Sequence, residues 1–213
     1  MAIPTGLFAY TDGQIVTFNG NTYRVISATD NTLCFLGTDD SKTGELEIPA
    51  TVSDKVDIIF TVTQVGDPAP YYCRNITSIK LPETILSLNA DCFRGASLES
   101  INIPKNLTSI NEYAWSSLQK VPKQTVAPDN PVFSSDTDGV LYSKDGTVLR
   151  SVPSNVTLTG GTYTVNSNVT KITNTAFRSV NNLTKIVFPM NLAEVSTGYP
   201  TIAPTGTITE FAI

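Results

Sequence analysis

The side chains that most enzymes use for acid–base and nucleophilic chemistry are scarce in this sequence. Its 213 residues include no histidine, which excludes Ser-His-Asp and Cys-His arrangements. The three cysteines, Cys34, Cys73 and Cys92, are odd in number and widely spaced, so they fit neither a disulfide framework nor a four-ligand zinc site. No phosphate-binding glycine motif is present. We therefore expect a non-catalytic protein that needs no cofactor and no metal.

Two short acidic stretches carry oxygen ligands of the kind that calcium prefers. They are TDD at residues 38–40 and DTDG at residues 136–139. Neither is followed by the rest of an EF-hand loop, notably its closing glutamate. Because Asp and Gly also favour tight turns, turn formation is the simpler interpretation, and calcium binding is the alternative.

The composition argues against two classes of partner. Fourteen basic and 19 acidic residues give a formal net charge of −5, which does not suit nucleic acid or anionic membranes. No apolar run reaches the roughly 18 residues that a membrane-spanning helix needs. The first residues lack the charged and apolar regions of a signal peptide, so we expect either an intracellular protein or a chain whose export signal has been removed.

The apolar residues that must position any site follow a repeat. The stretch ITSIKLPETILSLNADCF at residues 76–93 has the same apolar skeleton as LESINIPKNLTSINEYAW at residues 98–115. Similar skeletons follow at YTVNSNVTKITNTAF (163–177) and LTKIVFPMNLAEV (183–195), and the pattern begins upstream with LEIP at 46–49. A period of 22–23 residues with apolar-x-x-apolar-x-apolar is the signature of leucine-rich repeats.

The spacing predicts a short strand in each repeat, with alternate side chains inside and outside the stack. Ile101 and Ile103 point inward, and Ser100 and Asn102 point outward. Pro104 ends the strand because it has no N–H to donate. We expect Ala114 and Trp115, further along the repeat, to lie in a short helical or 3₁₀ turn. The predicted fold class is therefore a β-dominated α/β repeat, a leucine-rich repeat solenoid that is stable only as an array.

These motifs resemble the BspA-like leucine-rich repeat family, whose hallmark is LTSIxIPxxVTxIxxxAF. The resemblance covers about Leu46 to Val195 outside one insertion, and the sequence departs from it at Pro70, at Asn166 and in the C-terminal stretch. It implies a secreted or surface-anchored bacterial protein of the Bacteroidetes type that acts in adhesion or protein binding. It also implies that an export signal has been removed from this chain.

The boundaries follow from where the repeat is interrupted. Residues 6–40 alternate as in strands, with a hairpin signal at NGN, and predict a β-rich N-terminal cap over residues 1–45. Repeats occupy residues 46–120. Residues 121–160 predict an inserted β-hairpin flap, with its turn at Asp145-Gly146. Residues 161–213 return to repeats and end in a C-terminal cap, so the whole chain is one continuous solenoid domain.

The outward strand positions are the expected interaction face. We interpret them as a surface for a protein partner, without catalysis. Glycan binding, as an accessory of polysaccharide uptake, is one alternative, motivated by the adjacent aromatic pair Tyr71 and Tyr72 and by the flap at residues 121–160. A passive structural spacer is another. The candidate interaction residues are Glu45, Glu47, Ser78, Lys80, Ser100, Asn102, Lys185, Val187, Tyr71 and Tyr72.

Overall fold

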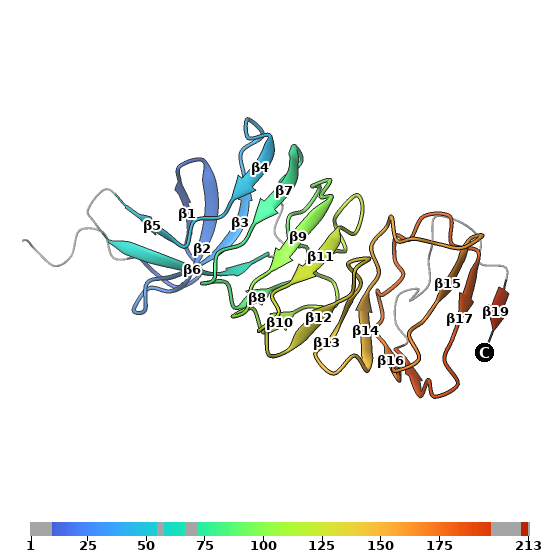
Figure 1. Cartoon of the computed structure of the whole chain (residues 1–213). Helices are drawn as coiled ribbons and strands as arrows, with labels where there is room; N and C mark the ends of the chain where they lie inside the picture. The colour runs from blue at the N-terminus through green and yellow to red at the C-terminus, as the bar shows by residue number, and fades with distance from the viewer. Residues whose placement is uncertain (1–9, 55–57, 67–71, 197–209, 213) are drawn as a thin grey trace, which may run out of the picture.

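The computed structural model describes residues 10–54, 58–66, 72–196 and 210–212. These residues form an elongated stack of short strands that advances from the N-terminal to the C-terminal end of the chain (Figure 1). Most strands pair in parallel with the equivalent strand of the next repeat, so each repeat adds one layer. A single repeat leaves its apolar side uncovered, and the neighbouring layer covers it.

One side of the stack begins with a four-stranded parallel sheet, which we name the front sheet. Partner residues in neighbouring repeats lie 22 or 23 positions apart, as in Ile79 with Ile101 and Ile101 with Gln124. The first spacing is wider, because Leu46 pairs with Ile79. In chain order the strands are β4 (Gly44–Glu47), β7 (Ile76–Lys80), β9 (Ser100–Ile103) and β11 (Lys123–Val126).

A second parallel sheet follows near the C-terminal end, separated from β11 by the insertion. Its register repeats the same spacing, because Tyr163 pairs with Ile186. We name it the C-terminal front sheet. Its strands are β15 (Thr162–Thr164), β17 (Lys185–Val187) and β19 (Glu210–Ala212).

The N-terminal strands and the return strands of the first repeats share one further sheet. Its first three strands are antiparallel, and β3 then pairs in parallel with β6. Asn19 and Gly20 both have positive φ in the turn between β1 and β2, as a tight hairpin turn requires. The strands are β1 (Ile15–Phe18), β2 (Asn21–Ser27), β3 (Thr32–Thr38), β5 (Thr51–Ser53), β6 (Ile59–Val65), β8 (Ser87–Leu88) and β10 (Ser109–Ile110).

The insertion is built into the stack. Within residues 121–160, β12 (Phe133–Ser135), β13 (Leu141–Ser143) and β14 (Val148–Ser151) form an antiparallel meander. Strand β14 then pairs in parallel with β16 (Lys171–Ile172), which pairs with β18 (Glu194–Val195). The same range also contains β11, the last strand of the front sheet.

The expected helical or 3₁₀ turn is wrong for the residues that the structure describes, which contain no helix. Around Ala114 and Trp115, backbone hydrogen bonds join residues three apart only at alternate positions, so they close separate turns. In the preceding repeat, Asp91 and Phe93 have φ of 55° and 54°. A helix cannot continue through left-handed residues of this kind.

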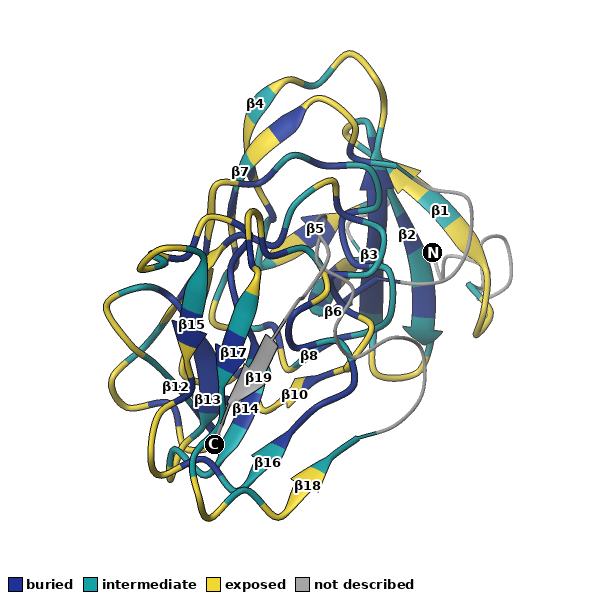
Figure 2. Ribbon diagram, turned by 90° about the vertical axis from the view of Figure 1, so that its right-hand side faces the viewer, coloured by how far each residue is buried: buried dark blue, intermediate teal, exposed yellow. Residues whose placement is uncertain are grey.

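The core follows the predicted apolar skeleton. Ile79, Ile101 and Ile186 occupy equivalent inward positions and are all buried. Figure 2 looks along the stack and shows buried residues on the strands and exposed residues on many of the turns. A chain of aromatic contacts continues the core into the N-terminal strands, with Phe35 lying 5.7 Å from Tyr23 and 6.4 Å from Phe93 between ring centroids.

The buried apolar residues form two clusters that meet at Val140 and Leu141. Polar contacts join the layers across this boundary. Arg150 donates from Nη2 to the carbonyl of Ile110 at 2.7 Å. The Ser154 hydroxyl accepts the N–H of Val121 at 2.8 Å.

Candidate functional site

The candidate site is the outward face of the front sheet. Strand β9 shows the alternation most plainly: Ser100 and Asn102 are exposed, and Ile101 and Ile103 are buried. Alternate residues of a strand point to opposite faces, so burying the isoleucines places the polar residues on the surface. The sequence thus determines which side chains a partner can touch.

The outward residues form two rows across the sheet. Neighbouring strands lie about 4.8 Å apart, so each row is a ladder with a fixed spacing. The register aligns Glu45, Ser78, Ser100 and Lys123 in one row and Glu47, Lys80, Asn102 and Thr125 in the other.

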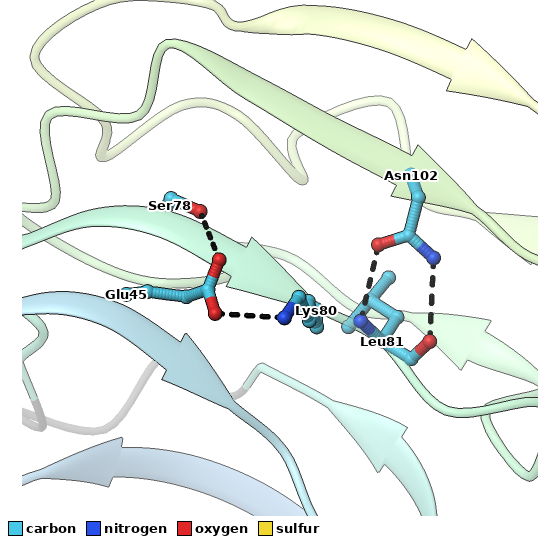
Figure 3. A network of polar contacts seen from close by, with 5 residues as sticks. All are labelled: Glu45, Ser78, Lys80, Leu81 and Asn102. Carbon is cyan, nitrogen blue, oxygen red and sulfur yellow. Dashed lines mark hydrogen bonds and ion pairs between the residues drawn. The ribbon is translucent and has the colours of Figure 1, made fainter.

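An ion pair joins the first two strands of this face. The Nζ of Lys80 lies 2.8 Å from Oε1 of Glu45, and the Ser78 hydroxyl lies 3.4 Å from Oε2 of the same carboxylate (Figure 3). The hydrogen bond from Lys80 lowers the pKa of Glu45, and the Glu45 carboxylate raises the pKa of Lys80. Both side chains are open to solvent, so the pair organises the surface and adds little stability.

Asn102 holds the backbone of the preceding repeat. Strand β7 ends at Lys80, so the N–H and carbonyl of Leu81 lie beyond the ladder. The Asn102 side chain accepts from the Leu81 N–H at 3.2 Å and donates to the Leu81 carbonyl at 3.3 Å (Figure 3). It therefore satisfies two backbone groups that need partners, and its amide is already engaged within the stack.

A shallow hollow of about 250 Å³ opens beside these contacts. Glu47, Lys80 and Asn102 line it together with Leu81 and Pro82. The hollow therefore offers both signs of charge beside apolar surface. Such a mixture can receive polar and apolar side chains of a protein.

The other predicted residues do not join this face. Lys185 and Val187 lie on β17, in the C-terminal front sheet. Tyr72 precedes β7, and its ring is covered by the guanidinium of Arg74 at 4.1 Å from the ring centroid. A ring face covered in this way does not offer a stacking surface for a sugar. Tyr71 lies outside the described residues.

Sequence reasoning missed two members of the face, Lys123 and Thr125. Both are exposed on β11, in line with Ser100 and Asn102. The signal was hidden because Gln124, 1% exposed, stands where the preceding repeat has Ile101. Aligning VPKQTV with LESINI would have revealed the strand.

The acidic stretches make turns. Asp39 accepts the N–H of Ser41 at 3.0 Å through Oδ1, and Asp136 accepts the N–H groups of Asp138 and Val140, both at 3.0 Å. Within the described part of the chain, no three His, Cys, Asp or Glu side chains gather in a metal-binding arrangement. None of the same residues forms a helix long and apolar enough to cross a bilayer.

The three cysteines are buried and form no disulfide, so we expect the folded chain to resist thiol reagents. Burial raises the pKa of Cys73 to about 12 and that of Cys92 well above its usual value. A raised thiol pKa favours folding below pH 9, and this contribution is lost as the pH rises toward 12. Ellman's reagent at pH 8 should titrate no thiol before urea is added and three afterwards. Rapid reaction of the native chain would contradict this burial.

A stack of parallel strands that repeats every 22 or 23 residues defines the chain as a leucine-rich repeat protein. The sequence pattern of the BspA type leucine rich repeat region matches in six copies, over residues 51–134 and 157–199. Because these matches cover more than half of the chain, it belongs to the BspA-type leucine-rich repeat family.

Solved structures provide more distant comparisons. A leucine-rich repeat protein from Eubacterium ventriosum is 17% identical, with a TM-score of 0.47, and the match covers 84% of this chain but only 66% of that one. A leucine rich cell surface protein from Faecalibacterium prausnitzii is 14% identical, with a TM-score of 0.40 and coverages of 95% and 77%. The pneumococcal vaccine antigen PcpA is 18% identical, with a TM-score of 0.35 and coverages of 96% and 71%. No curated protein sequence matches the chain.

Proposed function

We propose that this chain is a non-catalytic interaction module that binds a protein partner through the outward face of the front sheet. Two rows of outward polar side chains on four parallel strands carry the proposal, and all of them are exposed except the half-buried Ser78. The strands hold these side chains at a fixed spacing, so a partner meets a preorganised surface and loses less entropy on binding. Family membership supports the same function, since leucine-rich repeats commonly mediate protein contacts.

The chemistry of the face favours protein over other partners. Carboxylates and amines are mixed on it, as with Glu45, Glu47 and Lys80, so it has no single sign of charge to attract a polyanion. We propose an extracellular or cell-surface location, because only 15% of the residues are charged and the family resemblance implies export. Antibody labelling of intact source cells tests this location.

Binding to immobilised extracellular-matrix and cell-surface proteins tests the function. We expect at least one partner to bind at micromolar concentration. Ser100→Lys adds a cation to the outward face, and Ser109→Lys makes the same change at an exposed serine on β10, in the other sheet. We expect Ser100→Lys to weaken binding about tenfold and Ser109→Lys to leave it within about twofold.

Three results would contradict the proposal. No binding across a broad panel favours the passive spacer. Binding only to glycans favours the accessory of polysaccharide uptake. Equal losses in the two lysine variants would place the contact somewhere other than the front sheet.

A further inference from the structure

A polar hollow lies where the front side of the stack is interrupted. Strand β11 ends the front sheet and β15 begins the C-terminal front sheet (Figure 1). The turn at residues 136–139 covers the edge of β11, because the N–H of Gln124 donates to the carbonyl of Gly139 at 3.1 Å. Residues 136–142 and 157–166 enclose a hollow of about 350 Å³.

The lining of this hollow selects the chemistry of a ligand. Hydroxyl, amide and carboxylate groups dominate it, and none of the described residues that line it is Lys or Arg. An anion such as phosphate would meet Asp136 and Asp138 without a cation to balance them. An apolar ligand would strip water from polar groups without replacing their hydrogen bonds.

The carboxylates already have donors inside the protein. Asp136 accepts the backbone N–H groups of Asp138 and Val140, and its Oδ2 also accepts the hydroxyl of Tyr142 at 3.2 Å. Asp138 accepts the hydroxyl of Thr157 at 3.2 Å. Burial is the main cause that raises the pKa of Tyr142 to about 12. The hydrogen bond with Tyr163 lowers this pKa, and the charge of Asp136 raises it further. The phenol therefore stays protonated, and these contacts hold the carboxylates in place.

The threonine hydroxyls and the Asn166 amide that line the hollow can still donate and accept hydrogen bonds. The hydroxyls of Thr159, Thr162 and Thr164 make no hydrogen bond to any residue that the structure describes. Asn166 accepts the N–H of Asn168 at 3.0 Å through Oδ1, which leaves its NH₂ group available. A threonine hydroxyl is one donor and two acceptors, and a sugar hydroxyl has the same capacity. A cationic side chain, by contrast, could use only the acceptors.

We propose that this hollow binds a neutral sugar residue of a glycan. Its volume is near the lower end of the range of about 300–1,000 Å³ for small-molecule sites, which suits one or two sugar rings. Carboxylates held by Tyr142 and Thr157 accept from the sugar hydroxyls. The threonines of β15 and the Asn166 amide supply the matching donors. The site is separate from the outward face of the front sheet, so it adds a second ligand class to the proposed protein binding.

Titration of the isotopically labelled full chain by NMR tests this site. The probes are the methyl glycosides of glucose, galactose and mannose, with agmatine as the cationic comparison. We expect one glycoside to shift the methyl signals of Val140 and Thr164 with a Kd in the range of about 1–10 mM. Thr162→Val combined with Thr164→Val keeps the side-chain shape and removes two hydroxyls, which should weaken binding about tenfold. Thr125→Val, an exposed change on β11 outside the hollow, should leave the Kd unchanged.

The outcomes separate this site from its alternatives. Absence of shifts with every glycoside at about 50 mM overturns it, and so does saturable binding of agmatine alone. Unchanged glycoside binding in the double valine variant also overturns it. If that variant does not fold, Thr159→Val takes its place, with the same expected direction. Binding of a matrix protein to the front sheet should be unaffected by the valine changes at Thr159, Thr162 and Thr164, so failure here leaves the proposed function untouched.

Discussion

Replacing Asn130 by leucine should lower the free energy of unfolding by about 4 kcal/mol. The side chain is fully buried and uses all of its strong hydrogen-bonding capacity. Its Nδ2 donates to the carbonyls of Pro104 and Leu107 at 2.8 and 2.9 Å. Its Oδ1 accepts the N–H groups of Val132 and Phe133 at 2.9 and 2.8 Å. Leucine has a similar size but removes all four hydrogen bonds away from water, and the Pro104 carbonyl keeps the N–H of Leu107 at 3.2 Å.

Urea denaturation followed by circular dichroism measures this loss. Asn106→Leu is the matched control, because Asn106 is exposed and its side chain makes one hydrogen bond, to the carbonyl of Glu83. We expect the control to lose less than about 1 kcal/mol. Asn130→Asp keeps the acceptors, loses both donors and buries a charge, so it should also be severely destabilised. A loss below about 1 kcal/mol for Asn130→Leu would show that water replaces the amide.

The role of Asn130 shows where sequence reasoning stops. The apolar skeleton predicted the buried positions of the repeats, because each layer packs on an equivalent layer and the same slots recur. Asn130 stands 23 positions after Leu107, in a slot that holds an apolar residue in the preceding repeat, and its partners Pro104 and Leu107 belong to that repeat. A search for the apolar skeleton passes over a polar residue in such a slot, and its hydrogen bonds depend on the backbone groups that the preceding layer presents to it.

The sequence predicted the outward placement of some residues of the candidate face, but not of all. Alternation around Ile79 and Ile101 gave the outward residues of β7 and β9, because a buried strand leaves only one face for polar groups. Strand β11 was missed because the polar residue Gln124 occupies an inward slot. The use of Asn102 as a clamp on Leu81 was also not foreseen, since it depends on where the neighbouring strand ends.

Substitution of Gly66 by alanine is expected to destabilise the chain by about 3 kcal/mol. Gly66 is buried directly after β6, with φ of +93°. A Cβ there would lie 2.7 Å from Sγ of Cys92 and 3.0 Å from the carbonyl oxygen of Ala90. The free-energy costs of the strained backbone and of the steric overlap add together. The backbone cannot shift to relieve the overlap, because the N–H of Gly66 donates to the carbonyl of Phe35 at 2.9 Å.

Gly146→Ala separates these two causes. Gly146 has a similar φ of +74°, but a Cβ there would have nothing within 4 Å, so it should cost only the backbone strain of about 1–2 kcal/mol. Cys92 occupies the slot that holds Ala114 in the next repeat, so Cys92→Ala is compatible with the stack. Combined with Gly66→Ala, it removes the sulfur contact and should restore part of the lost stability in urea denaturation. If the two glycine variants lose the same stability and Cys92→Ala restores none, the tight contact between these layers does not limit the stability of the stack.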